Sequence, residues 1–134
     1  MSKYGAKPTI IGGIKFASKA EAQRYVVLNH LEKAGKISDL ILQPNFILQE
    51  KFSHYGKIIR AISYVADFLY LENGKSIVED VKGMKTPVYE LKLKLFLSLY
   101  GGIYTFREIH NGKVVELCGR ATAPISKVDA PDRQ

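Results

Sequence analysis

The chain has 134 residues, of which 46% are hydrophobic and 25% charged, a composition typical of a globular protein with a buried core. Twenty Lys and Arg residues against 13 Asp and Glu residues give a formal net charge of +7, which favours a polyanionic partner such as nucleic acid. No apolar run approaches the roughly 18 residues that a membrane span needs, and we expect neither a signal peptide nor a membrane partner. The single cysteine, Cys118, excludes a disulfide framework and a cysteine zinc site, and it fits a reducing cytoplasm.

The N-terminal part of the chain predicts a basic N-terminal segment, two short strands and a helix. Residues 2–19 hold four lysines and no acid: Lys3, Lys7, Lys15 and Lys19. Residues 9–16 are typical of two strands around a Gly-Gly turn. Ser18 and Glu21 then have the S-x-x-E spacing of a capping box, and Ala34-Gly35 supplies a helix stop, so we expect a helix between them.

The middle of the chain is rich in β-branched and aromatic residues and predicts strands. One strand is expected at about residues 40–50, where Pro44 indicates a sheet edge or a bulge. A hairpin follows, with strands at residues 58–71 and 76–82. Its turn is Asn73-Gly74, the sequence signal of a type I′ turn.

The C-terminal part predicts a second helix and a last hairpin. Thr86-Pro87 supplies an N-cap and a first helical residue, and the helix is expected to run to about Tyr100. The hairpin strands are expected at residues 103–109 and 114–117, joined by another Asn-Gly pair.

The order of these elements is typical of a mixed α/β domain. We expect one domain over residues 1–120, with a mixed β-sheet flanked by two main helices. Residues 121–134 contain two prolines and little apolar bulk, and they are expected to form a disordered tail.

Two aspartates are the first candidates for a functional site. If Asn73-Gly74 is the loop of the hairpin, the pairing sets Asp67 opposite Asp80. Lys82 shares the face of this pair, whereas Glu79 points to the other face. Two carboxylates opposed across a ladder lie about 5 Å apart and repel by about 3 kcal/mol at an effective dielectric constant near 20. A hard divalent cation between them removes the conflict, and Mg²⁺ prefers carboxylate oxygens.

Other interpretations of this pair stay open. The aspartates could be exposed to solvent, Asp80 and Lys82 could form an ordinary solvated ion pair, and a bulge would break the register. In the catalytic interpretation, Lys82 orients or activates a water molecule, or stabilises the charge that develops on a phosphate.

Glu21 is the candidate for a third metal ligand. It falls on the core-facing stripe of the first predicted helix, together with Tyr25, Leu28 and Leu31. It also occupies the N3 position of the capping box, where its side chain would bond the N-cap amide. The sequence leaves both roles open.

Lysines around the second predicted helix are candidate phosphate contacts. Lys92 falls within an apolar stripe, where a lysine either extends to water or contacts a phosphate near the carboxylates. The stripe consists of Val88, Leu95, Phe96 and Leu99. Lys94 lies on the polar side, and Lys85 and Thr86 at the helix N-terminus are suited to meet a phosphate through the helix dipole.

The acid of the first helix, followed by Asp67 and then by Asp80-Val81-Lys82 across a hairpin, resembles the core of the PD-(D/E)XK nucleases. Several segments more closely resemble a small family of phage and prophage proteins, over roughly residues 3–110. These segments are residues 3–7, 16–22, 42–44, 64–68 and 79–86, and the Asp-Val-Lys-Gly block is the most specific of them. Ala66 stands where the name of the motif has proline.

The resemblance implies a restriction-endonuclease-like core and Mg²⁺-dependent phosphodiester cleavage, with Mn²⁺ as an alternative metal. It gives the nuclease roles to four residues: Glu21, Asp67, Asp80 and Lys82. The first three would bind the metal, with the carbonyl of Val81 as a further ligand. Small basic members of this superfamily resolve Holliday junctions as homodimers, and the resemblance extends to that activity.

We therefore predict a structure-selective DNA endonuclease similar to a Holliday junction resolvase, acting in phage DNA recombination in the cytoplasm of an infected or lysogenic bacterium. Its expected partner is four-way DNA, bound by a homodimer through the basic N-terminal segment and through Lys85, Lys92 and Lys94. The competing interpretation is a non-catalytic DNA-binding or recombination-accessory protein of the same fold. All four candidate catalytic residues argue against it, because a binding module has no need to oppose two aspartates.

Overall fold

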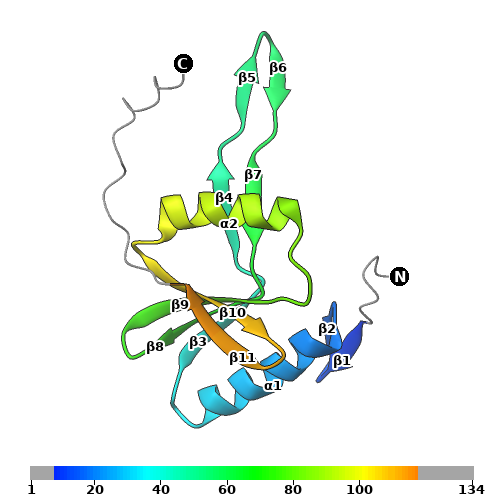
Figure 1. Ribbon diagram of the computed structural model, residues 1–134, viewed down its shortest axis with the longest axis vertical. Helices are drawn as coiled ribbons and strands as arrows, with labels where there is room; N and C mark the ends of the chain where they lie inside the picture. Colours follow the sequence, from blue (N-terminus) through cyan, green and yellow to red (C-terminus); the bar gives the residue numbers. More distant parts are fainter. Residues whose placement is uncertain (1–7, 118–134) are drawn as a thin grey trace.

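The computed structural model describes residues 8–117 of the chain (Figure 1). The two helices are α1 (Lys19–Lys33) and α2 (Pro87–Tyr100). The strands are β1 (Thr9–Ile11), β2 (Ile14–Phe16), β3 (Ser38–Leu42), β4 (Asn45–Gln49), β5 (Phe52–His54), β6 (Lys57–Ile59), β7 (Ile62–Val65), β8 (Phe68–Glu72), β9 (Lys75–Val81), β10 (Tyr104–His110) and β11 (Lys113–Leu117). The predicted tail and Lys3, Lys7 and Cys118 lie outside the described residues. Within residues 8–117, no helix combines the length and the apolar character that crossing a membrane requires.

A five-stranded mixed sheet lies between the two helices (Figure 1), in the strand order β11-β10-β9-β8-β3. β9 and β10 run parallel, and the other neighbours run antiparallel. Successive residues of β9 point to opposite faces of the sheet. Ile77 packs into the core under α1, and Val78 packs into the core under α2. The predicted mixed α/β class, with a mixed sheet and two main helices, is therefore confirmed.

Both helices begin where the sequence predicts. The hydroxyl oxygen of Ser18 accepts a hydrogen bond from the amide of Glu21 at 3.1 Å, and that of Thr86 accepts one from the amide of Tyr89 at 3.1 Å. These bonds satisfy amides that the first turn of a helix leaves without partners. Pro87 follows Thr86 as the first helical residue, where its fixed φ suits the helix and its missing N–H costs nothing.

The hairpin of β8 and β9 has the predicted turn and register. Glu72 pairs with Lys75, and the ladder continues without a shift to Phe68 and Glu79. Asn73 and Gly74 both have positive φ, as a type I′ turn requires.

Two predicted strands are wrong in their extent. The stretch at residues 40–50 divides at Pro44 into β3, which joins the central sheet, and β4, which pairs with β7. Proline has no N–H to donate, so the ladder cannot continue through it. The stretch at residues 58–71 divides into β6, β7 and β8. Of these strands only β8, which begins at Phe68, belongs to the central sheet.

The apolar stripe predicted for the second helix is wrong at three of its four residues, because only Phe96 of that stripe is buried. The core-facing side of α2 carries Tyr89 and Phe96, which are buried. Within residues 8–117, α2 exposes the large apolar side chains of Val88, Leu91, Leu95 and Leu99. The helix is apolar around most of its circumference, so hydrophobicity alone could not identify the buried side.

A narrow projection extends from the body of the protein (Figure 1). β4 and β7 form its base against α2, and β5 and β6 form a hairpin at its far end. We call residues 51–61 the finger. Its tight turn uses Tyr55 and Gly56, both with positive φ. The local sequence does not predict this turn, because tyrosine rarely adopts that conformation.

Candidate functional site

The two opposed aspartates lie where β8 begins and β9 ends, near the N-terminus of α1. Asp67 directly precedes β8, and its amide donates to the carbonyl of Glu79 at 3.1 Å instead of continuing the regular ladder. One carboxylate oxygen of Asp67 accepts a hydrogen bond from the amide of Val81 at 2.8 Å. The Asp67 carboxyl lies beside that of Asp80 and interacts with it.

Asp80 is the most perturbed acid of the site. Its side chain is almost completely buried, and the hydroxyl of Tyr64 donates a hydrogen bond to it. Burial first, and then the adjacent charge of Asp67, raise the pKa of Asp80 from 3.8 to about 8, against the opposing effects of Lys82 and Tyr64. At neutral pH without metal, the pair therefore retains a proton that a divalent cation can replace.

Glu21 reaches the same end of the sheet from the first turn of α1. Burial raises the pKa of Glu21 to about 7, with a further contribution from the negative charge of Asp67. A hydrogen bond from the backbone of Ala17 and the charge of Lys82 oppose this rise. Glu21 and Asp67 line one small pocket together with Lys15 and residues of β2 and β3. The Glu21 side chain accepts its backbone hydrogen bond from Ala17, the residue before the predicted N-cap partner Ser18, whereas the Ser18 cap uses the backbone amide of Glu21.

Lys82 completes the group at the end of β9. Its ammonium lies 3.5 Å from a carboxylate oxygen of Asp80 and 3.8 Å from the centre of the Tyr89 ring. This cation–π contact holds the side chain beside the acids. Lys82 also lines a pocket between α1 and the turn after β10, together with Arg24 and Asn111.

The residues fit a hard divalent cation in their chemistry. Carboxylate oxygens are the ligands that Mg²⁺ prefers, and the contact between Asp67 and Asp80 concentrates two of them at one point. Among residues 8–117, no three His, Cys, Asp or Glu side chains already converge as a complete ligand set. Magnesium sites usually include several water ligands and only one or two carboxylates. The amide of Val81 donates a hydrogen bond to Asp67 at 2.8 Å, which places this residue beside the acids.

The predicted phosphate-binding lysines are spread over several surfaces. Lys15, Lys19 and Lys94 are exposed, and Lys92 is half-buried. The ammonium of Lys85 lies 3.1 Å from the carboxylate of Glu108, so Lys85 is occupied by an ion pair that the sequence did not indicate. Lys3 and Lys7 lie outside the described residues.

Glu108 is a buried acid that the sequence interpretation missed. It pairs with Asp80 across the parallel strands β9 and β10. It accepts hydrogen bonds from the Tyr89 hydroxyl at 2.6 Å and from His110 Nε2 at 2.9 Å, beside Lys85. Burial raises the pKa of Glu108, but these three partners outweigh it and hold the pKa below its usual value. Only the parallel pairing reveals this neighbour, and local sequence does not specify that pairing.

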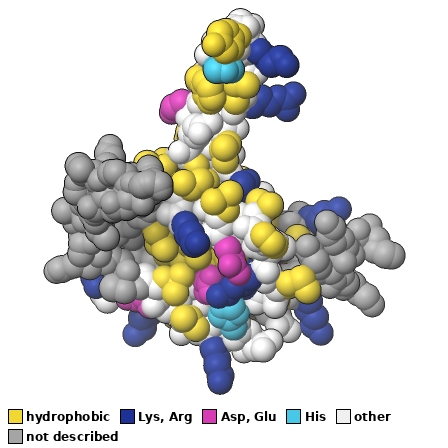
Figure 2. Space-filling view, turned by 45° about the horizontal axis from the view of Figure 1, so that its top comes forward, with side chains coloured by type: hydrophobic (Ala, Val, Ile, Leu, Met, Phe, Trp, Pro, Cys, Tyr) yellow, Lys and Arg dark blue, Asp and Glu magenta, His cyan; other side chains and the backbone are white. Residues whose placement is uncertain are grey.

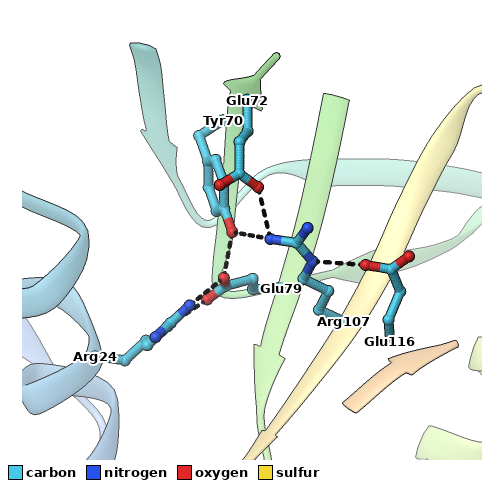
Figure 3. A network of polar contacts seen from close by, with 6 residues as sticks. All are labelled: Arg24, Tyr70, Glu72, Glu79, Arg107 and Glu116. Carbon is cyan, nitrogen blue, oxygen red and sulfur yellow. Dashed lines mark hydrogen bonds and ion pairs between the residues drawn. The ribbon is translucent and has the colours of Figure 1, made fainter. Parts of the chain in front are cut away.

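A second polar network lies on the α1 side of the sheet (Figure 3). The guanidinium of Arg24 donates two hydrogen bonds to the carboxylate of Glu79, at 2.8 and 2.6 Å. The hydroxyl of Tyr70 donates a third bond to Glu79 and accepts one from Arg107. Glu79 is fully buried, so Arg24 provides the charge that it needs. Because Arg24 follows Glu21 by one helical turn, this pair also fixes the helix that carries Glu21.

One face of the molecule displays acidic, basic and histidine side chains close together, surrounded by hydrophobic ones (Figure 2). Other basic side chains project from the edges of this face and from one side of the finger. Exposed cations of this kind attract a polyanion.

Comparisons with known proteins identify a family but no activity. No curated protein matches the chain. A solved structure titled "Crystal structure of SSO0001" is similar at 14% sequence identity and a TM-score of 0.39, over 77% of this chain. The chain spans about half the length of that protein, 51%. The model of a family described as "Protein of unknown function (DUF1064)" matches residues 1–116, and the chain therefore belongs to the DUF1064 family.

Proposed function

We propose that this protein is a Mg²⁺-dependent, structure-selective DNA endonuclease with a restriction-endonuclease-like core, acting as a Holliday junction resolvase in phage DNA recombination. The observation that supports the proposal is the meeting of Glu21, Asp67, Asp80 and Lys82. These residues come from α1, from the residue before β8 and from the end of β9. A fold without this chemistry gains nothing from two acids in contact beside a lysine, since their repulsion costs stability.

In the proposed site, Asp67 and Asp80 hold the metal ion, and Glu21 extends the set of oxygen ligands. When bound, a divalent cation would lower the pKa of a water molecule and neutralise charge on the phosphate. The water oxygen attacks phosphorus in line with the leaving oxygen, and one phosphorus–oxygen bond forms as the other breaks. Lys82 donates a hydrogen bond to a non-bridging oxygen as its charge grows. The attacking water releases a proton to solvent, and the leaving oxygen takes a proton from solvent.

The substrate and the assembly are further parts of the proposal. The net charge of +7 suits DNA, and resolution of a four-way junction requires two symmetric nicks, which a two-fold homodimer supplies. The exposed apolar side chains of α2 support the involvement of a second copy, because a contiguous apolar face is more stable when covered. We place the enzyme in the cytoplasm of a phage-infected or lysogenic bacterium.

Lys82→Ala is the variant that tests this function most directly. We expect it to lose Mg²⁺-dependent cleavage by orders of magnitude while it still binds branched DNA, because phosphate contacts elsewhere on the surface remain. Nicking of labelled four-way, duplex and single-stranded DNA measures cleavage, and fluorescence anisotropy measures binding. Lys33→Ala is the matched control, since Lys33 is exposed at the far end of α1. Full cleavage by the Lys82 variant would contradict the assigned role.

Glu21→Gln separates the helix cap from the metal ligand. Glutamine keeps a side-chain oxygen that can accept the bond from Ala17, and the Ser18 cap is untouched. It is a much poorer ligand for Mg²⁺ because the charge is gone. We expect a melting temperature close to that of the wild type, and cleavage reduced by orders of magnitude. Full activity in this variant would show that Glu21 acts in the helix cap and is not a metal ligand.

A further inference from the structure

The finger carries an unbalanced positive charge. Between residues 51 and 61, it has three cationic side chains, Lys51, Lys57 and Arg60, and no acid. None of the three forms an ion pair with any residue from 8 to 117. By contrast, Arg24, Lys82 and Arg107 of the body have acidic partners. The finger therefore presents charge that the described part of the protein does not neutralise.

The tip of the finger presents an aromatic side chain to solvent. Tyr55 is 96% exposed at the turn, and its ring meets the ring of His54 edge-on, with the ring centres 4.6 Å apart. Because nearly all of its surface is exposed, the tyrosine ring is available for stacking. Ile58 and Phe52 add exposed apolar surface on the two sides of the hairpin. An exposed aromatic ring among cations is the combination that stacks on nucleic-acid bases.

The finger is joined directly to the candidate site. β7 runs from the finger back toward the body, and the hydroxyl of Tyr64 on this strand donates a hydrogen bond to Asp80. Two residues later the chain reaches Ala66, whose amide donates to the carbonyl of Pro44 at 3.1 Å, and then Asp67. At roughly 3.3 Å per residue, the chain from Asp67 to Tyr55 reaches at most about 40 Å. This upper limit is comparable to the length of one turn of duplex DNA, roughly 34–36 Å.

We propose that the finger is a DNA-binding element that recognises branched or unpaired DNA away from the cleaved bond. Lys51, Lys57 and Arg60 contact phosphates, and the Tyr55 ring stacks on a base that is exposed where the helix is interrupted. This inference rests on the proposed function in one respect, the identity of the polyanion as DNA. Its charge and its aromatic tip favour nucleic acid over a protein partner, because a protein interface of this kind would need acids opposite three unpaired cations.

The test compares neutral variants of the finger with a matched set elsewhere. The triple variant Lys51→Gln, Lys57→Gln, Arg60→Gln removes the three charges, and the control Lys33→Gln, Lys36→Gln, Lys75→Gln removes three exposed charges outside the finger. Binding to a four-way junction is measured in EDTA by fluorescence anisotropy, over a range of salt concentrations. The finger variant should bind at least about tenfold more weakly, and the slope of log affinity against log salt should fall by up to about 3. The control should change far less.

Tyr55→Ser tests the stacking part of the proposal. The loss of one stacked base should weaken junction binding by about fivefold or more, whereas an uninterrupted duplex of the same length should bind as before. Tyr55→Phe keeps the ring and should bind the junction like the wild type. Because the finger lies outside both cores, melting temperatures should be unchanged in all these variants.

Several outcomes would overturn the inference. They are wild-type junction affinity in the triple variant, an equal loss in the control, and absence of DNA binding by the wild-type protein. Sedimentation without DNA provides another, since a shift from dimer to monomer in the finger variants would assign the finger to a contact between copies. Failure of the nuclease proposal is distinguishable, because it would show as DNA binding without cleavage when Mg²⁺ is restored.

Discussion

Asp80→Asn should abolish Mg²⁺-dependent cleavage and, in the metal-free protein, raise the free energy of unfolding at pH 8. The variant loses the charge that a metal ligand needs, so cleavage falls by orders of magnitude. Its amide can donate to the carboxylate of Asp67 and accept from the hydroxyl of Tyr64, so both contacts of the wild-type carboxyl have replacements. The removed repulsion is worth up to about 3 kcal/mol. Urea unfolding in EDTA measures the change in stability, and a nicking assay measures cleavage. Mg²⁺ titration calorimetry measures the loss of metal affinity.

The stability of the metal-free protein should depend on pH, because the pKa of Asp80 differs between the folded and unfolded states. Asp80 has a pKa raised from 3.8 to about 8, so the folded protein binds a proton that the unfolded chain has released. Stability of the metal-free wild type therefore falls as the pH rises from about 4 to about 8. Asp80→Asn should flatten this fall, and Mg²⁺ should restore stability to the wild type alone. Asp39→Asn is the control, since Asp39 is an exposed acid on β3. Unchanged Mg²⁺ affinity in the Asp80 variant would sink the metal assignment.

Arg24→Ala should destabilise the protein by about 3–5 kcal/mol, the usual cost of leaving a buried charge without its partner. Glu79 is fully buried, and only the Tyr70 hydroxyl would remain to stabilise its carboxylate. Guanidinium unfolding measures this loss. Cleavage should fall as well, since α1 also carries Glu21 and is no longer fixed against β9.

Two companion variants make the origin of this loss identifiable. Arg107→Ala breaks ion pairs with the more exposed Glu72 and Glu116, and should cost less than about 1 kcal/mol. The double variant Arg24→Met, Glu79→Gln leaves no buried charge and should recover most of the lost stability. Equal losses in the Arg24 and Arg107 variants would show that burial of Glu79 is not the cause.

Local signals predicted the parts of this structure that depend on nearby residues. Ser18 and Thr86 define the helix starts through bonds to amides three residues ahead. Asn73-Gly74 defines a hairpin whose register brings Asp67 near Asp80. Each of these features depends on contacts between residues close in sequence, or on pairing propagated from a turn.

Features that depend on distant residues were not predictable. Glu108 meets the α2 side of the site only because β10 adds parallel to β9, and parallel pairing has no turn to define it. The contact of Tyr64 with Asp80 requires the chain to leave the central sheet after β3, to form β7 beside β4, and to return at β8. The buried side of α2 depends on which surface of an apolar helix the strands happen to cover, and the stripe containing Lys92 was placed there wrongly.

The adjacent acids of β9 have a consequence for how the chain folds to one alignment. Glu79 and Asp80 point to opposite faces, one to the guanidinium of Arg24 and the other to the hydroxyl of Tyr64. A slip of β9 by one residue would exchange the faces of these two acids and deprive both of their donors at once. Each unpaired buried carboxyl would cost several kcal/mol. The misaligned sheet is therefore destabilised on both of its faces, at Glu79 on one face and at Asp80 on the other.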